Sequence, residues 1–266
     1  MPGPIPEPMP GPVSRAAAAP RPRPEELLPP HELALCFGGG DFLKIGRGLV
    51  RRMRDWAGLT PESRVLDVGC GVGRAAVPLT AFLSPAGRYE GFDTYPFGID
   101  WASANITPHF PNFRFRSVEV FNNLYNPAAP VRARDFVFPY EDASFDFVLL
   151  NSVFTHMLPE DVLGYLGQIA RVLAPGGRVY CTWFLMNPDA REQLRQNPGT
   201  AIRLEHGYGK FFVDNREDPE EAVGYEESFA RGMLGSAGLD VRGVRPGSWC
   251  GRKAPNYQDV VVAAKG

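Results

Sequence analysis

A glycine-rich turn that follows a short apolar stretch is the part of the sequence best suited to holding a ligand. Its three glycines, Gly69, Gly71 and Gly73, alternate with Cys70 and Val72. Glycines at this spacing let the backbone pass close to a bound molecule, and the amides at the start of a following helix add a favourable dipole. The turn therefore indicates a binding site at the end of a strand.

Acidic residues at the ends of two predicted strands narrow the choice of ligand. Asp67 stands two residues before the first glycine, and Asp93 ends the next predicted strand, where an acid meets ribose hydroxyls in nucleotide-binding folds. Arg74 replaces the last glycine of a dinucleotide-binding turn, and no Gly-Lys-Ser/Thr ending marks a P-loop. Two acids without a phosphate-binding turn indicate a nucleoside that lacks phosphates and carries a positive centre. S-adenosylmethionine is such a ligand.

Two histidines are candidate general bases. His156 comes shortly after the predicted fourth strand, and an imidazole can take up and release a proton near neutral pH. Alternatively, His156 has only a structural role and either caps a helix or contacts residues that bind the cofactor. His206, in a polar segment, is the second candidate base. Asn151 and Ser152, just past the same strand, are expected to face the cofactor and acceptor, because ligands bind outside the carboxyl ends of parallel strands.

The apolar pattern from about residue 35 onward alternates between helices and strands. Helices are predicted at 43–56, 75–83, 161–173 and 225–237, and strands at 64–68, 88–93, 113–120, 145–150, 178–184, 241–244 and 259–263. This rhythm predicts an α/β fold with a doubly wound sheet. Residues 187–224 break the rhythm, and their aromatic content suggests a lid or an acceptor-site insert.

Three of these segments together carry a resemblance to a known family. Residues 65–74 resemble motif I of the class I S-adenosylmethionine-dependent methyltransferases, and residues 144–148 and 171–178 resemble that family's later motifs. The resemblance covers roughly residues 36–266. It implies a Rossmann-like methyltransferase fold, with a seven-stranded, mostly parallel sheet whose last strand, 259–263, is antiparallel.

The resemblance also implies roles for the glycine turn. Gly69, Gly71 and Gly73 would line the methionine end of S-adenosylmethionine, with Cys70 contributing its backbone between them. Asp67 would approach the amino group of the methionine, and Asp93 would bind the ribose hydroxyls.

The family often places an acidic and an apolar residue around the adenine after the third strand. Glu119 and Val120 are the first choice for this pair, and Asn122 is the competitor. The segment 121–130 is unusually long and turn-rich, so which of these residues lies at the adenine stays open.

Composition excludes several classes of protein. The 266 residues carry 28 Lys+Arg and 30 Asp+Glu, a net charge of −2, so the basic excess typical of nucleic-acid binding is missing. No apolar run approaches the ~20 residues of a membrane helix. The four cysteines lie far apart, and no cluster of acids and histidines suggests a metal. We therefore expect a cytoplasmic protein with no nucleic-acid, membrane or metal partner; the oligomeric state stays open.

The first 30 residues differ from the rest, because they hold 11 of the 27 prolines. Such a stretch lacks amide donors and apolar mass, so a disordered tail is expected over residues 1–34, followed by a methyltransferase domain over 35–266.

The expected reaction is O-methylation of a small organic molecule. A sulfonium already makes its methyl group electrophilic, so the enzyme mainly has to align the acceptor. In the resembling families, enzymes that methylate amide or base nitrogens typically have an Asn/Asp-Pro-Pro-Tyr run after the fourth strand, and enzymes that methylate a pyrimidine carbon commonly have a Pro-Cys pair. This sequence has neither. N- or C-methylation of a small molecule stays open, as does a non-catalytic scaffold with the cofactor fold. Arg74 counts against a nicotinamide dehydrogenase.

Overall fold

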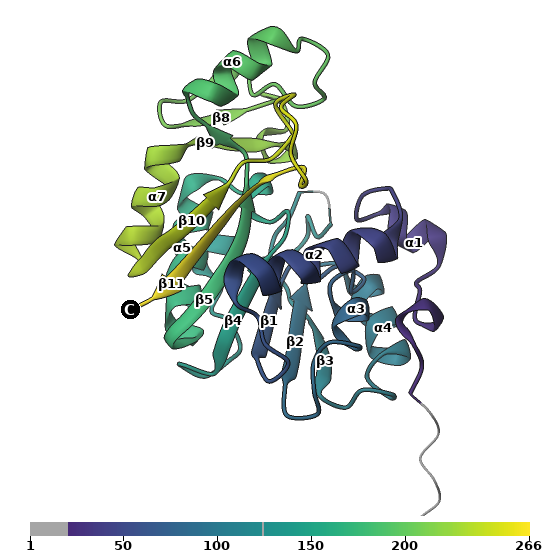
Figure 1. Cartoon of the computed structure of the whole chain (residues 1–266). Helices are drawn as coiled ribbons and strands as arrows, with labels where there is room; N and C mark the ends of the chain where they lie inside the picture. Colours follow the sequence, from purple (N-terminus) through teal and green to yellow (C-terminus); the bar gives the residue numbers. More distant parts are fainter. Residues whose placement is uncertain (1–20, 124) are drawn as a thin grey trace, which may run out of the picture.

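A seven-stranded sheet forms the centre of the computed structural model, which describes residues 21–123 and 125–266 (Figure 1). From one edge to the other the strands are β10 (Leu239–Arg245), β11 (Asp259–Lys265), β5 (Leu173–Trp183), β4 (Phe145–Leu150), β1 (Arg64–Val68), β2 (Arg88–Asp93) and β3 (Phe113–Ser117). β11 pairs antiparallel with both neighbours, and the pairs from β5 to β3 are parallel. The predicted sheet with an antiparallel last strand is confirmed.

Helices cover both faces of this sheet, as expected for a doubly wound fold. On one face lie α2 (Phe42–Ala57), α3 (Ala76–Leu79) and α4 (Pro96–Asn105), and on the other lie α5 (Pro159–Val172) and α7 (Glu227–Ser236). Successive side chains on a strand point to opposite faces. In β4 this alternation sends Phe147 and Leu149 into the core below α2, whereas Val148 and Leu150 join the core below α5.

Local chemistry fixes where the best-defined helix begins and ends. The Asp41 side chain accepts a hydrogen bond from the Lys44 amide and caps α2, which ends where Gly58 adopts a left-handed conformation. The helix predicted at 75–83 is shorter, since α3 spans four residues and turns continue the chain to Leu83. Pro78 has no amide to bond the Arg74 carbonyl, so it limits the helix on its N-terminal side.

Four predicted strands have different bounds in the structure: β10 and β11 are longer than the predicted 241–244 and 259–263, and β3 and β5 also differ. β3 ends at Ser117 rather than at residue 120, because the chain turns away towards the loop before β4. β5 begins at Leu173, directly after α5, although Pro175, Gly176 and Gly177 were expected only to stop that helix. Gly176 takes a positive φ of 75°, and the β4–β5 register shifts between Phe145 and Phe147. The glycines thus form an irregular start to the strand.

Residues 187–224, which interrupt the predicted alternation of helices and strands, form most of a second, four-stranded sheet. Its order is β6 (Leu185–Met186), β9 (Val223–Glu226), β8 (Phe211–Val213) and β7 (His206–Gly207), accompanied by α6 (Pro188–Gln196) and the 3-10 turn η4 (Pro219–Glu221). Tyr225 belongs to β9, so the helix predicted from residue 225 begins at Glu227. The buried carboxylate of Asp259 accepts hydrogen bonds from the amides of Leu185 and Gly247 and from the indole of Trp249, each at 2.7 Å. These bonds anchor the insert to the main sheet.

The N-terminal part of the described chain is packed against the domain. Pro24–Glu26 form a 3-10 turn, His31–Leu35 form α1, and Leu27 is buried. The tail expected over residues 1–34 therefore differs from the structure from residue 24 onward, because Leu27 supplies an apolar anchor within the proline-rich composition. Residues 1–20 lie outside the described part.

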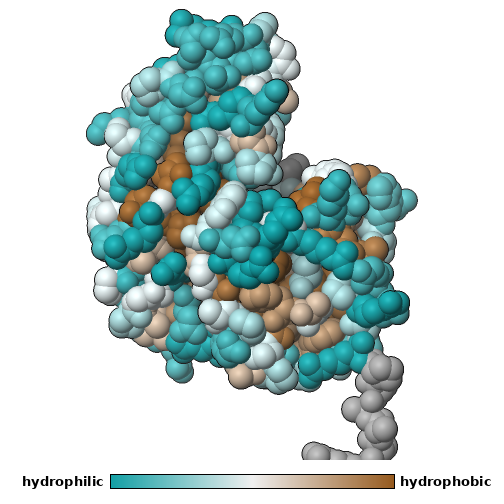
Figure 2. Space-filling model, in the orientation of Figure 1, coloured by the Kyte–Doolittle hydropathy of each residue, from teal (hydrophilic) through white to brown (hydrophobic). Residues whose placement is uncertain are grey.

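The space-filling view shows a notch between the lobe formed by the insert and the part that contains α1 and α2 (Figure 2). The surface of the insert lobe is mainly hydrophilic in this view. Within residues 21–123 and 125–266, no helix is both long and apolar enough to cross a bilayer.

Candidate functional site

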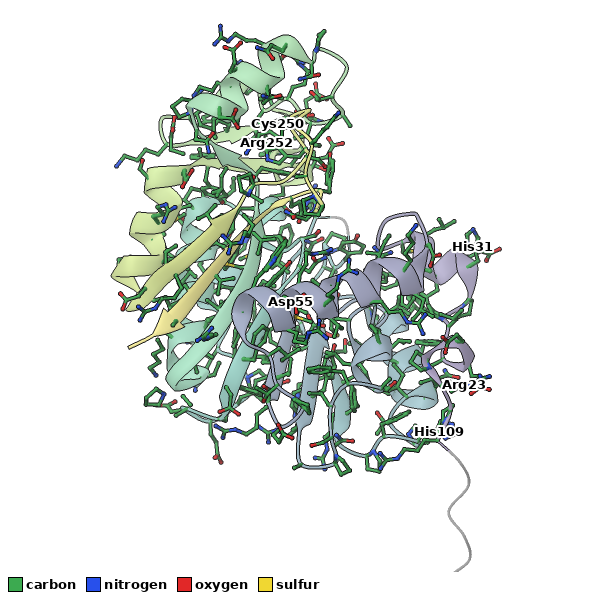
Figure 3. The ribbon with its side chains drawn as sticks, viewed as in Figure 1. Arg23, His31, Asp55, His109, Cys250 and Arg252 are labelled. Carbon is green, nitrogen blue, oxygen red and sulfur yellow. The ribbon has the colours of Figure 1, made fainter. Side chains whose placement is uncertain are left out.

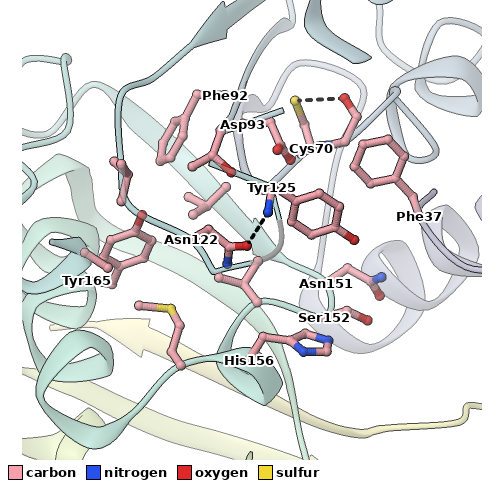
Figure 4. Close-up of a pocket in the computed structure, with 18 of the residues that line it drawn as sticks. Phe37, Cys70, Phe92, Asp93, Asn122, Tyr125, Asn151, Ser152, His156 and Tyr165 are labelled. Atoms are coloured by element: carbon pink, nitrogen blue, oxygen red, sulfur yellow. Dashed lines mark hydrogen bonds between the residues drawn. The ribbon is translucent and has the colours of Figure 1, made fainter. Parts of the chain in front are cut away.

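A cavity of about 670 Å³ lies outside the carboxyl ends of β1, β2 and β4 (Figure 4). Its volume falls in the range of about 300–1,000 Å³ typical of small-ligand sites. The predicted residues that line it are Asp67, Gly69, Cys70, Gly71, Asp93, Val120, Asn151, Ser152 and His156. The sheet thus brings most of the predicted site together at the edge where parallel strands place ligands.

The glycine turn after β1 needs glycine for two reasons. Gly69, Gly71 and Gly73 have φ angles of 72°, 55° and 82°, in the left-handed region that disfavours other residues. A Cβ on Gly71 would also lie 2.7 Å from the ring of Phe37. Gly73 does not line the cavity; it lies against α3, where a Cβ would come within 3.3 Å of the Cβ of Ala76.

Asp93 at the end of β2 holds the glycine turn. Its Oδ2 accepts a hydrogen bond from the Gly71 amide at 2.7 Å, and its Oδ1 accepts one from the Tyr95 amide at 2.9 Å. Burial raises the pKa of this carboxyl, while the amide bonds oppose the rise. A carboxylate has about four acceptor sites, so Asp93 retains the capacity to accept hydrogen bonds from ligand hydroxyls.

Asp67 near the end of β1 is buried, and its pKa is raised. The Tyr89 hydroxyl donates a hydrogen bond to its Oδ2 at 2.7 Å. Burial raises the pKa of Asp67 to about 7; the Tyr89 bond lowers it and the nearby Asp93 raises it. A carboxyl in this position strongly favours a positively charged partner, because such a partner would compensate the cost of burying its charge.

Cys70 lines the cavity mainly as a small side chain. Its thiol lies against Gly91 and points back to the Gly71 carbonyl at 3.9 Å. Burial, with Asp67 and Asp93 nearby, raises the pKa of the thiol. Cys70 therefore stays protonated and is a poor nucleophile.

The residues after β3 are arranged differently from the expected placement of Glu119 and Val120 at the site. Val120 is buried and lines the cavity, as does Asn122, whereas Glu119 is exposed and does not line it. Val118 and Val120 both turn inward, so the intervening Glu119 faces outward, where its carboxylate meets Asn126 at 3.5 Å. Glu119 therefore does not line this cavity, whereas its competitor Asn122 does.

Asn151 and Ser152 follow β4 directly. Ser152 has a positive φ of 60°, a conformation that costs energy for a residue with a side chain and is concentrated at functional sites. Its amide donates to the Thr182 hydroxyl at 2.8 Å, and its own hydroxyl donates to the Gln258 side chain at 3.0 Å. The Asn151 side chain makes no hydrogen bond within the described residues and lines the cavity, so it is available to a ligand.

His156 lies in the 3-10 turn η3 (Phe154–His156), away from Asp93 in the close-up view (Figure 4). Its Nδ1 lies 3.0 Å from the main-chain oxygen of Glu220. A carbonyl can only accept, so Nδ1 carries the proton and the Nε2 of the neutral ring is left as an acceptor. This tautomer is the one that a general base needs.

The other three histidines do not line the cavity. His206, the alternative base, lies in β7 of the insert. His31 and His109 are exposed on the outside of the molecule (Figure 3). Among the histidines, only His156 lines the cavity.

Aromatic residues that sequence reasoning missed close one side of the cavity. Phe37 stacks on Tyr125 with ring centroids 5.9 Å apart, and Tyr95 meets both rings edge-on. The Tyr125 hydroxyl donates to the Cys36 carbonyl at 3.0 Å, and the Arg74 guanidinium donates to the Gly38 carbonyl. These residues come from three separate loops, so no local pattern could have grouped them. The glycines at 38–40 were the one signal of a special backbone there.

A set of acidic residues was also missed. Asp161 at the start of α5 and Asp218, Glu220 and Glu221 around η4 line the cavity near His156. The insert thereby contributes directly to the site. The described residues hold no group of three or more His, Cys, Asp or Glu side chains placed to bind a metal ion.

Comparison with known proteins identifies the family to which this chain is similar. A family model described as a methyltransferase domain matches residues 41–217. Sterol 24-C-methyltransferase erg6 of Schizosaccharomyces pombe is 29% identical over 166 residues, which cover 62% of this chain and 39% of the relative. tRNA N(3)-cytidine methyltransferase METTL2 of Gallus gallus is 26% identical over 134 residues, 49% of this chain and 33% of the relative. The chain thus spans only about a third to two fifths of these relatives.

Solved structures share the fold at low identity. The Burkholderia thailandensis 1,6-didemethyltoxoflavin-N1-methyltransferase, solved with 1,6-didemethyltoxoflavin and S-adenosylhomocysteine, has a TM-score of 0.55 and 17% identity. The match covers 88% of this chain and 83% of that one. At this identity the likeness supports the fold.

Proposed function

Because the chain belongs to the S-adenosylmethionine-dependent methyltransferase family, we propose that it transfers a methyl group to a hydroxyl oxygen of a small organic molecule. One observation carries the proposal. A single cavity has the glycine turn with Asp67 and Asp93 on one wall and His156, with its acceptor nitrogen free, on another.

The residues of the first wall fit S-adenosylmethionine. The cavity of about 670 Å³ is large enough for a nucleoside with an amino-acid arm and an acceptor beside it. Asp93 would accept from the ribose hydroxyls, and the buried Asp67 would face the amino group. Gly69 and Gly71 leave the backbone open to the ligand, and Val120 with Asn122 would border the adenine.

His156 would act as the general base. When bound, S-adenosylmethionine would supply a methyl group on a positively charged sulfur; the acceptor oxygen would attack the methyl carbon, and the sulfur would leave as the neutral thioether of S-adenosylhomocysteine. The protein then has to hold the acceptor hydroxyl and remove its proton. The Glu220 carbonyl fixes the imidazole through Nδ1, so Nε2 can take that proton. His156 is exposed, so the proton can pass on to solvent.

The charge of the cavity supports a small acceptor over a nucleic acid. Six carboxylates line it, from Asp67, Asp93, Asp161, Asp218, Glu220 and Glu221, against two guanidinium groups, from Arg74 and Arg132. A phosphate backbone needs basic partners and would be repelled here. The relative that acts on tRNA keeps RNA as the alternative that an experiment must exclude.

Methyl transfer from labelled S-adenosylmethionine tests this function. The purified protein would be incubated with labelled donor and either a small-molecule extract or total RNA, and the labelled product would be isolated for NMR. We expect label in the small-molecule fraction, attached to oxygen. Label in RNA, or on nitrogen or carbon, would refute the proposed acceptor class, and binding of the donor without any transfer would favour the scaffold.

A further inference from the structure

The end of the cavity beside His156, where the acceptor would bind, is lined by acidic side chains. Its four carboxylates come from Asp161, Asp218, Glu220 and Glu221. Within the described part of the chain, none of them forms an ion pair with a basic side chain. Arg132 also lines the cavity, but its guanidinium lies 3.9 Å from the centre of the Phe121 ring.

The hydrogen bonds that these carboxylates do make are uncharged. The Arg134 amide donates to Asp161, Asn123 donates to Asp218 at 3.3 Å, and Asn215 donates to Glu221. The half-buried Glu220 carboxylate has no hydrogen-bond partner among the described residues. Burial first and the neighbouring Asp161 next raise the pKa of Glu220, whereas the positive charge of Arg132 lowers it. Four neighbouring carboxylates with a single nearby cation, Arg132, leave a net negative potential that a ligand can compensate.

Tyr165 supplies a second, independent sign of a polar ligand. It lies one turn after Asp161 on α5, on the same face of the helix, and lines the cavity. The side chain is only 5% exposed, yet its hydroxyl makes no hydrogen bond within residues 21–123 and 125–266. Because Tyr165 lines the cavity, a polar group of a ligand can bond this hydroxyl there.

These acids are not needed for the cofactor. Asp67 and Asp93 already stand at the strand ends beside the glycine turn. By contrast, Asp218, Glu220 and Glu221 come from the insert, beside His156. Their charge therefore acts on whatever lies next to the base, which is the acceptor.

We propose that this end of the cavity binds a positively charged amino group of the acceptor, so that the substrate is a small hydroxylated amine. This inference rests on the proposed function, since it concerns the same site. An ammonium has three donors. The Glu220 carboxylate, with Asp161 and Asp218 near it, and the Tyr165 hydroxyl, near Asp161, offer acceptors for them. The hydroxyl to be methylated would then lie towards His156 Nε2.

Three phenols that differ only in the charge of their side chain test the proposal. Tyramine is cationic, tyrosol is neutral and 4-hydroxyphenylacetate is anionic. Binding of each would be measured by calorimetry on the full chain saturated with S-adenosylhomocysteine. We expect tyramine to bind at least roughly tenfold more tightly than the other two, as for a hydrogen-bonded charge. Equal binding, no binding of any of the three, or preference for 4-hydroxyphenylacetate, which Arg132 would favour, overturns the proposal.

Isosteric variants locate the binding. Glu220→Gln keeps the main-chain oxygen that holds His156, and Asp218→Asn keeps the oxygen that accepts from Asn123. Each should weaken tyramine binding severalfold and leave tyrosol and S-adenosylhomocysteine unaffected, as should Tyr165→Phe. The matched control is Glu217→Gln, an exposed acid in the same segment that does not line the cavity. Unchanged tyramine binding in all three variants also overturns the proposal.

The two proposals fail differently. If S-adenosylhomocysteine does not bind, the proposed function falls and the acceptor inference falls with it. If it binds and the three phenols bind alike, the acceptor inference alone is wrong.

Discussion

The carboxylate of Asp93 accepts a hydrogen bond from the amide of Gly71 at 2.7 Å, so the end of β2 holds the turn that follows β1. This bond joins the two sequence features that predicted the site, the acid and the glycines. Because Gly71 has a positive φ of 55° and lies under the Phe37 ring, the turn keeps its shape only with a residue that lacks Cβ.

Gly71→Ala should therefore destabilise the protein by about 1–2 kcal/mol, the cost of a left-handed conformation for a residue with a side chain. It should also weaken S-adenosylhomocysteine binding, because Phe37 must move. Urea unfolding and calorimetry measure the two effects. The control is Gly232→Ala in α7, where a Cβ meets nothing within 4 Å and alanine should stabilise the helix by up to about 1 kcal/mol. Equal stability of the two variants would mean that the turn tolerates a Cβ.

Asp67 should make stability depend on pH. Its pKa is raised from 3.8 to about 7 in the folded protein, so between these values the folded state keeps a proton that the unfolded state has lost. Stability from this group therefore falls as pH rises towards 7 and is level above it.

Asp67→Asn removes this dependence while keeping an oxygen for the Tyr89 hydroxyl. Between pH 5 and 7.5, wild type should lose on the order of 2–3 kcal/mol more unfolding free energy than the variant. Urea unfolding at both pH values gives the comparison. Parallel pH profiles would show that Asp67 titrates normally.

His156→Ala should separate catalysis from cofactor binding. Loss of a general base lowers kcat by about 10²–10⁴-fold, whereas S-adenosylhomocysteine affinity should stay the same because His156 lies away from Asp93. His109→Ala, on the outside of the molecule, is the control. Full turnover in the His156 variant would assign the histidine a structural role.

The sequence predicted the sheet well and the surroundings of the site less well. β1, β2 and β4 have the bounds expected from their apolar runs, because strands buried on both faces leave a clear pattern. β3 was predicted too long, and Glu119 was placed at the cavity, because alternation continues past Ser117 although pairing does not.

The insert could not be predicted for a different reason. β6, β7 and β8 have only two or three residues each, too few for a period to appear. The acids at 218–221 reach the cavity only because β9 returns beside β6. Phe37 and Tyr125 meet across 88 residues of chain, a contact that no local signal encodes.

The central claim is that this cavity binds S-adenosylmethionine through Asp93. Calorimetric titration with S-adenosylhomocysteine tests it on wild type, Asp93→Asn and the control Asp100→Asn, an exposed acid on α4. We predict binding to wild type and the control, and a loss of roughly 10- to 100-fold in Asp93→Asn, since an amide accepts fewer hydrogen bonds than a carboxylate. No binding to wild type, or equal binding to Asp93→Asn, would contradict the claim.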